Sequence, residues 1–258
     1  MTAKSAFVDR SRDMEETAWW NLWNTSYRVN DNNDAISHEH FVRMASIING
    51  VIQKEEVSLL EVGCGTGTLS RMLTCSKYHG IDLSPAAVEV AGEKLPFIPQ
   101  TLTREASKYE VADFHVWPLP DEQFDVTICI DAIAFFRDQA FVMRKIAESV
   151  RTNGIVVIST INRFVYERIR RVGGVRLESG PVSKWLSRRE LHDLIRSANL
   201  TIEHSETIMP RGNKGVLRLL NSPRLNRVAN LFGEARIKRM KEKAGLGQYS
   251  VVIARKCR

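Results

Sequence analysis

The sequence feature that most constrains the fold is a glycine-rich turn at residues 61–67, which reads EVGCGTG. It ends a short apolar run, residues 57–63, of the kind found in strands that are covered on both faces. Residues 66–74 then have a helical pattern, and the first turn of a helix carries unpaired N–H groups. Gly63 and Gly65 allow a tight bend and let a ligand approach where no Cβ intervenes. The pattern therefore predicts a strand–turn–helix unit with a binding turn.

An acidic residue follows at the end of the next predicted strand, residues 78–84. This residue is Asp82, twenty-one positions after Glu61. In doubly wound sheets a carboxylate at this place accepts hydrogen bonds from ribose hydroxyls. The dinucleotide fingerprint G-x-G-x-x-G requires a glycine at position 68, where this chain has Thr68. The dinucleotide fingerprint is therefore not intact, and the remaining alternative to a binding site is a tight turn in a nonbinding α/β protein.

Strands and helices alternate along most of the chain. Further strands are predicted at residues 124–131, 155–161, 201–208 and 249–256. Further helices are predicted at residues 38–53, 85–95, 139–150, 186–200 and 222–232. Ser187 and Glu190 have the spacing of a capping box at the start of one of these helices. Such alternation predicts an α/β fold with parallel strands and right-handed crossovers.

The composition argues against export and membrane insertion. No run of eighteen apolar residues is present, and the first sixteen residues lack an apolar region, so neither a transmembrane helix nor a secretory signal is expected. The four cysteines have no metal-ligand spacing. They are interpreted as reduced thiols of a cytoplasmic protein, with no metal site.

Charge is distributed unevenly along the chain. The net charge of +7 combines −7 over residues 1–160 with +14 over residues 161–258. A basic C-terminal region indicates an anionic partner, such as a phosphorylated substrate, a carrier protein, RNA or a membrane surface. Solvated helix faces explain the same charges equally well. An RNA partner is disfavoured because no RNA-binding module or aromatic–basic platform is recognisable.

The glycine spacing together with Asp82 resembles the first motifs of class I S-adenosylmethionine-dependent methyltransferases. This resemblance implies S-adenosylmethionine as the cofactor. It also implies a Rossmann-like, mostly parallel seven-stranded sheet with an antiparallel last hairpin and helices on both faces. Asp113 and Phe114 are similar to the carboxylate and apolar pair that often hold the adenine in this class.

Several segments are similar to the ubiquinone-biosynthesis O-methyltransferase family over residues 19–163 and 184–205. The similar segments are Trp19-Trp20, the helix containing Arg43, residues 159–163 (STINR) and Trp185-Leu186-Ser187. The family's Glu-His pair is replaced here by Ala134-Phe135, so an acid/base or metal role at that place does not transfer. The insert at residues 209–247 has no counterpart that aligns.

The candidate site residues fall into three groups. The predicted cofactor contacts are Arg43, Glu61, Gly63, Cys64, Gly65, Asp82, Leu83, Asp113, Phe114 and Ile130. The candidate bases are His38, His40, His115 and Asp131, none of which stands in a diagnostic motif. The candidate substrate contacts are Trp19, Trp20, Tyr27, Phe135 and Tyr166. Ordinary alternatives exist for several: a surface arginine for Arg43, a turn cap for Asp113 and core packing for Ile130.

The predicted organisation has three parts. Residues 1–53 form an N-terminal helical and aromatic lid segment. Residues 54–208 and 248–258 form the S-adenosylmethionine-binding domain, and residues 209–247 form a basic helical insert or cap. We expect methyl transfer to a hydroxyl or amine of a small aromatic or amphipathic metabolite, which could be anionic or carrier-linked, with peripheral membrane contact through the insert. The alternatives are an RNA (tRNA) methyltransferase and a non-catalytic S-adenosylmethionine-binding scaffold.

Overall fold

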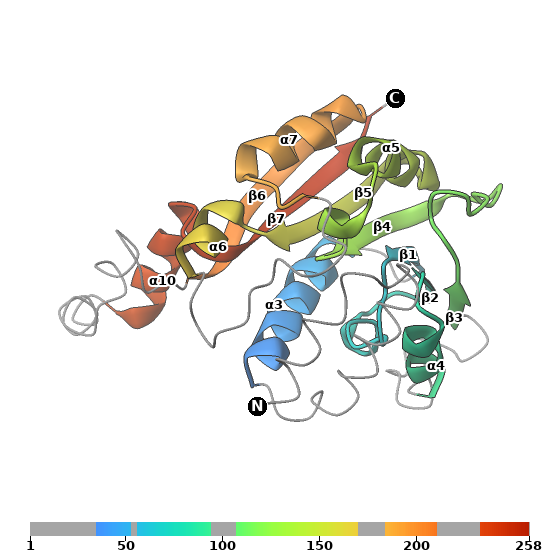
Figure 1. Ribbon diagram of the computed structural model, residues 1–258, viewed down its shortest axis with the longest axis horizontal. Helices are drawn as coiled ribbons and strands as arrows, with labels where there is room; N and C mark the ends of the chain where they lie inside the picture. Colours follow the sequence, from blue (N-terminus) through green and yellow to red (C-terminus); the bar gives the residue numbers. More distant parts are fainter. Residues whose placement is uncertain (1–34, 53–55, 94–106, 170–183, 211–232, 258) are drawn as a thin grey trace, which may run out of the picture.

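In the computed structural model of the protein, residues 35–52, 56–93, 107–169, 184–210 and 233–257 are described (Figure 1). They form one seven-stranded sheet with the order β3-β2-β1-β4-β5-β7-β6. The strands are β1 Ser58–Val62, β2 Lys77–Asp82, β3 Ser107–Val111, β4 Phe124–Ile130, β5 Val150–Ile161, β6 Leu200–Pro210 and β7 Gly247–Lys256. The first five strands pair in parallel, whereas β7 is antiparallel to both β5 and β6. The predicted Rossmann-like sheet with an antiparallel last hairpin is confirmed.

Helices cover both faces of this sheet. Those described are α3 Ala35–Val51, α4 Pro85–Glu93, α5 Gln139–Ser149, α6 Arg163–Ile169, α7 Arg188–Ser197 and α10 Glu234–Lys243. Figure 1 shows α5 and α7 together on one side of the sheet and α3 on the other. Among the described residues, no helix combines the length and apolarity that crossing a lipid bilayer would require.

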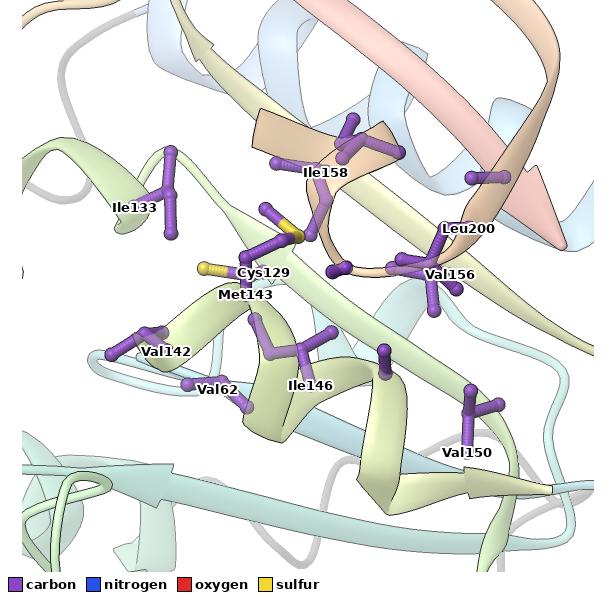
Figure 2. Packing of buried hydrophobic residues seen from close by; sticks show 14 of the residues in the cluster. Val62, Cys129, Ile133, Val142, Met143, Ile146, Val150, Val156, Ile158 and Leu200 are labelled. Carbon is purple, nitrogen blue, oxygen red and sulfur yellow. The ribbon is translucent and has the colours of Figure 1, made fainter. Parts of the chain in front are cut away.

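The core on the α5 and α7 side is built mainly from aliphatic side chains (Figure 2). Met143 and Ile146 of α5 pack with Cys129 of β4 and Ile158 of β5, and all four are fully buried. Leu200, at the start of β6, belongs to the same cluster. Burial of side chains of this size stabilises a fold by about 1.5–3 kcal/mol each.

The second core lies on the α3 side of the sheet. Met44 and Ile48 of α3 pack with Leu59, Ile128 and Val157. Neighbouring residues of β5 thus point into different cores, which is the period-two alternation of a strand covered on both faces. Helix α3, placed by the sequence in an N-terminal lid segment, is therefore a core element, while residues 1–34 lie outside the described residues.

Two local predictions need correction. The helix expected at residues 66–74 is only a 3₁₀ turn, η2, at Ser70–Met72. Here the Ser70 hydroxyl donates to the carbonyl of Gly67 at 2.9 Å, a local bond that competes with helix formation. Strand β3 was not predicted, because its sequence SKYEV is polar and only partly buried at the sheet edge.

Helix starts were predicted well where a side chain caps them. Ser187 and Glu190 form the expected capping box of α7. The Ser84 hydroxyl accepts from the backbone N–H of Ala87 at 3.2 Å at the start of α4. The basic helix predicted at residues 222–232 lies outside the described residues.

Candidate cofactor and acceptor site

The glycine turn follows β1 and is hydrogen-bonded to the carboxyl end of β2, where the backbone N–H groups of Gly63 and Cys64 donate to the carbonyl of Ile81. Gly63, Gly65 and Gly67 have φ angles of 78°, 52° and 66°, which is the left-handed region that favours glycine. A Cβ on Gly63 would lie 2.5 Å from the Cβ of Ala132, so this glycine permits close packing. A Cβ on Gly65 would meet no described atom within 4 Å, so this glycine borders open space.

Asp82 ends β2 beside the glycine turn. Its Oδ2 accepts from the backbone N–H of Gly65 at 2.8 Å, and its Oδ1 accepts from that of Ser84 at 2.9 Å. Burial raises the pKa of this carboxyl above its ordinary value, while the backbone N–H donors act in the opposite direction. The predicted acidic residue is therefore held rigidly at the strand end, next to the half-buried Leu83.

Glu61 and Cys64 lie on the inner side of the turn. The Tyr78 hydroxyl donates to Oε2 of Glu61 at 2.5 Å, and burial raises the pKa of Glu61 to about 8. Glu61 is therefore mainly protonated at neutral pH. Burial also raises the pKa of the Cys64 thiol well above its ordinary value, and its Sγ packs where a Cβ on Gly80 would lie. These two side chains are predicted cofactor contacts that the structure places in the interior.

The features of this turn fit the nucleoside part of S-adenosylmethionine. The space beside Gly65 admits a ligand, and the Asp82 oxygens keep lone pairs beyond those used by the backbone N–H donors. Both lie at the carboxyl ends of neighbouring parallel strands, where ligands bind in open α/β sheets.

Asp113 and Phe114 follow β3. Asp113 Oδ1 accepts from the backbone N–H of His115 at 2.9 Å and lies 3.0 Å from its Nδ1, so Asp113 caps a turn. Phe114 is 2% exposed and stacks on Trp117 with 6.1 Å between ring centroids. Their adenine-holding role stays a prediction.

Ile130 packs in the core, and Arg43 lies near two carboxylates. Ile130 is buried in the core cluster on the α3 side. Nη2 of Arg43 lies 3.9 Å from carboxylate oxygens of both Glu206 of β6 and Glu242 of α10, which are long ion-pair distances. Contacts of these two residues with the cofactor stay predictions.

The structure brings two of the candidate bases together. Nε2 of His40, on α3, lies 2.6 Å from Oδ2 of Asp131, just beyond the end of β4. The Ser159 hydroxyl donates to the other Asp131 oxygen at 2.6 Å, and the Tyr249 ring stacks on the imidazole at 3.9 Å. His38 is exposed on α3, and the His115 ring instead stacks on Phe141 at 6.0 Å.

Three half-buried aromatic rings form a second group, the aromatic cluster. Trp185 contacts Phe135, with centroids 5.7 Å apart, and Tyr166, with centroids 5.4 Å apart. Phe135 lies in the 3₁₀ turn η5 (Ile133–Phe135) after β4, and Tyr166 lies in α6 after β5. Two predicted substrate contacts are thus joined by a tryptophan. Trp19, Trp20 and Tyr27 lie outside the described residues.

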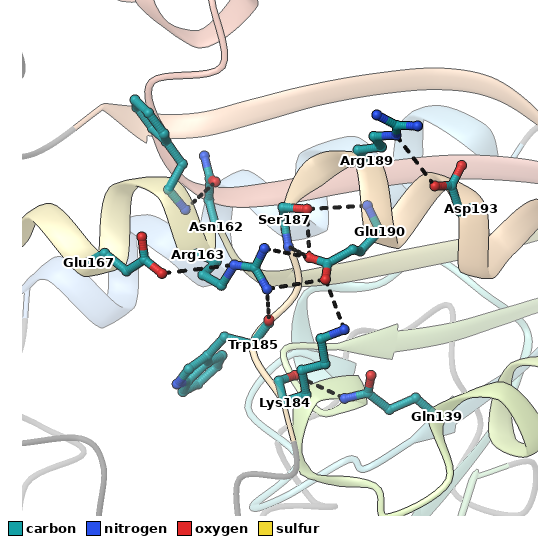
Figure 3. Close-up of polar contacts among 11 residues, drawn as sticks. Gln139, Asn162, Arg163, Glu167, Lys184, Trp185, Ser187, Arg189, Glu190 and Asp193 are labelled. Carbon is teal, nitrogen blue, oxygen red and sulfur yellow. Dashed lines mark hydrogen bonds and ion pairs between the residues drawn. The ribbon is translucent and has the colours of Figure 1, made fainter.

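Glu190 anchors the backbone that carries Trp185 (Figure 3). Its carboxylate pairs with Lys184 at 2.8 Å and with Arg163 at 3.0 Å, and it accepts from the Ser187 hydroxyl at 2.6 Å. These donors, first among them Lys184, lower the pKa of Glu190 to about 2. Residues 184–187 are therefore fastened to both α6 and α7.

Sequence reasoning missed Ser159, Tyr249 and Trp185 as members of these groups. Ser159 and Trp185 lie in the segments similar to the O-methyltransferase family, which was a usable signal. Tyr249 reaches His40 only through the pairing of β7 with β5, where it stands opposite Ile161. No local sequence pattern predicts a contact that depends on the pairing of two distant strands.

The glycine turn, the acidic strand end and the strand order together define the class I methyltransferase fold. Residues 36–205 match the sequence family described as "Methyltransferase domain". The chain belongs to this family, whose enzymes use S-adenosylmethionine.

Individual relatives agree with that assignment. The chain is similar to the ubiquinone biosynthesis O-methyltransferase of Aeromonas salmonicida, 36% identical over 107 residues, covering 41% of this chain and 43% of the relative. That of Rickettsia felis is 24% identical over 230 residues, covering 81% and 85%. The matches to the first two relatives span 43% and 49% of those proteins, about half their length.

Solved structures share the fold. The S-adenosylmethionine-dependent methyltransferase from Thermotoga maritima has a TM-score of 0.61 and 16% identity, covering 92% of this chain and 99% of that chain. Magnesium protoporphyrin IX methyltransferase from Synechocystis, with bound S-adenosylmethionine, has a TM-score of 0.59 and 11% identity, covering 99% and 98%.

Proposed function

We propose that the chain transfers a methyl group from S-adenosylmethionine to a hydroxyl of a small aromatic or amphipathic metabolite. The observation that carries this proposal is the aromatic cluster of Phe135, Tyr166 and Trp185. Two of its rings follow β4 and β5, whose carboxyl ends lie at the same sheet edge as the glycine turn. Flat rings at this edge suit a planar acceptor. The relatives named O-methyltransferases support oxygen as the acceptor atom.

In this proposal the chain's residues bind and orient two molecules. The Asp82 carboxylate accepts from the ribose hydroxyls, and the backbone at Gly65 lies against the nucleoside. When bound, S-adenosylmethionine supplies an electrophilic methyl group. The aromatic cluster holds the acceptor oxygen in line with that group, and such orientation lowers barriers by about 7–11 kcal/mol. Exclusion of water by the rings protects the methyl donor from side reactions.

A carrier-linked acceptor is a second candidate. A relative from Acetivibrio thermocellus, 24% identical over 149 residues, is named malonyl-[acyl-carrier protein] O-methyltransferase. The exposed side of α10 carries Arg236, Arg239 and Lys243, which would complement an acidic carrier. Free and carrier-linked forms of one acceptor separate the two candidates, because only a carrier-linked substrate loses affinity steeply as salt increases.

The test is a methyl-transfer screen with labelled S-adenosylmethionine against phenols, alcohols, amines, carboxylates and tRNA. We expect product with a phenol or alcohol. Product only with tRNA, or tight cofactor binding without any product, would favour the RNA or scaffold alternative and refute the proposal.

Variants at Trp185 test the aromatic cluster. Trp185→Ala should raise the KM for the acceptor by about tenfold, because one ring contact beyond simple burial is lost. Trp185→Phe, which keeps a ring, is the matched control and should stay close to wild type. Equal behaviour of both variants would exclude the cluster from acceptor binding.

A further inference from the structure

The geometry points to His40 as the base that takes the proton of the acceptor hydroxyl, with Asp131 and Ser159 as the residues that position it. This inference rests on the proposed hydroxyl acceptor. It assigns the acid/base chemistry to α3 and to the turn after β4, and not to Ala134-Phe135, which cannot perform it.

The His40–Asp131 contact determines which nitrogen is free. Nε2 lies 2.6 Å from the Asp131 carboxylate, so the neutral imidazole carries its proton on Nε2 and donates it there. The lone pair is then on Nδ1. This is the arrangement in which a carboxylate selects the tautomer and stabilises the imidazolium that forms during proton transfer.

The free nitrogen is buried and has no partner. His40 is 4% exposed, and Nδ1 makes no hydrogen bond to any of the described residues. A buried acceptor without a donor is uncommon, since the loss of hydration is not compensated. A substrate hydroxyl would supply the missing donor. The stacked Tyr249 ring holds the imidazole plane in place.

Asp131 is fixed as a positioning residue. Its φ of 58° lies in the left-handed region, a strained conformation that often marks functional sites. Its backbone N–H donates to the carbonyl and hydroxyl oxygens of Ser159 at 3.1 and 3.0 Å. The same hydroxyl donates back to Oδ1, and His40 occupies Oδ2. With His40 on Oδ2 and the Ser159 hydroxyl on Oδ1, Asp131 is held in the position from which it orients the imidazole.

The base lies next to the cofactor turn. Ala132, which follows Asp131, is the residue that a Cβ on Gly63 would strike at 2.5 Å. The turns after the neighbouring strands β1 and β4 therefore touch. A proton acceptor beside the second turn is close to the place where a methyl donor held by the first would react.

Two bonds break and two bonds form during the methyl transfer. The acceptor O–H bond breaks and its proton passes to Nδ1, while the oxygen forms a bond to the methyl carbon. The carbon–sulfur bond of the donor breaks, and its electron pair stays on sulfur, which becomes an uncharged thioether. The imidazolium beside Asp131 then releases its proton to water.

Several ionisable groups surround His40. Asp131 approaches from β4 and Tyr249 from β7, while Glu39 precedes it on α3. Arg43, one turn further along α3, lies near the carboxylates of Glu206 and Glu242. The Asp131 carboxylate is the charged group in direct contact with the imidazole.

His40→Gln is the first test, because its amide can still donate to Asp131 but provides no basic nitrogen. We expect kcat to fall about 10²–10⁴-fold, the usual contribution of a general base, with the S-adenosylmethionine Kd unchanged by calorimetry. His38→Gln, an exposed histidine on the same helix, is the matched control. Wild-type turnover by His40→Gln on an acceptor hydroxyl would overturn the inference and leave the proposed function standing.

Asp131→Asn and nitrogen NMR complete the test. Asparagine tolerates a positive φ, so this variant should keep the fold and cofactor binding while kcat falls at least tenfold. Nitrogen-15 spectra of histidine-labelled protein test His40 without any substrate. We expect the neutral form of the ring to carry its proton on Nε2, and a neutral form with its proton on Nδ1 would overturn the inference. Failure of the wild type to methylate any hydroxyl would instead refute the proposed function.

Discussion

Substituting alanine for Gly65 should separate cofactor binding from stability. Gly65 and Gly63 both have positive φ, so an alanine at either position costs about 1–2 kcal/mol of folding free energy. At Gly63 the new Cβ would also overlap Ala132 at 2.5 Å, adding about 1–3 kcal/mol of overpacking. We therefore expect losses of about 1–2 kcal/mol for Gly65→Ala and about 2–5 kcal/mol for Gly63→Ala.

Binding should respond differently from stability. The Gly65 Cβ would project into space without described atoms within 4 Å, which is where the cofactor is proposed to lie. The S-adenosylmethionine Kd of the folded Gly65→Ala variant should rise at least about 100-fold, equivalent to about 2.7 kcal/mol.

The assays are urea unfolding for stability and calorimetry for the Kd. Gly50→Ala is the control: this glycine lies in α3 with open space around it, so alanine should stabilise the protein by up to about 1 kcal/mol without changing the Kd. Wild-type affinity in Gly65→Ala would refute the proposed position of the cofactor. Equal stability losses at Gly63 and Gly65 would refute the packing argument.

Three further predictions concern stability. Glu61 has a pKa raised from 4.5 to about 8, so its contribution is full below pH 4.5 and is lost as the pH rises through about 8. In urea unfolding, the wild type should therefore lose up to about 3 kcal/mol of stability between pH 5 and pH 8, whereas Glu61→Gln should not lose this amount. An equal change in both proteins contradicts this. Glu190 has a pKa lowered from 4.5 to about 2, so its contribution is present above pH 4.5 and is lost as the pH falls through about 2. Glu190→Gln should cost about 1–2 kcal/mol at pH 7, allowing for solvent screening, and little at pH 2.5; equal costs at both pH values would exclude the charge as the cause. Met143→Ala, in the core, should cost about 2–5 kcal/mol in thermal unfolding, against less than about 0.5 kcal/mol for the exposed Met240→Ala. Similar losses in these two variants would contradict the packing shown for α5.

The sequence allowed prediction of elements that carry their own local signal. The buried strands β1 and β4 are apolar runs, the Ser187–Glu190 capping box is a spacing of three residues, and the glycine turn is a contiguous motif. Strand β3 lacked such a signal, since its stability comes from pairing with β2 and not from an apolar pattern.

The groups proposed to act on the acceptor could be predicted only in part. His40 and Asp131 were both candidates, but 91 positions separate them and only the tertiary fold shows that they touch. The contact between Phe135 and Trp185 likewise depends on where the residue ahead of α7 lies relative to η5. Patterns in sequence report periodicity within an element, whereas these contacts depend on how separate elements pack.

The burial of Cys64 has a consequence for a chain that handles an alkylating agent. A cysteine inside the cofactor turn is a ready target for unwanted methylation, but only the thiolate is an effective nucleophile. Because packing keeps Cys64 protonated and covered, the catalyst should survive many turnovers without inactivating itself. The exposed Cys257 is then a convenient position for attaching a fluorescent or affinity label without modifying Cys64 in the glycine turn.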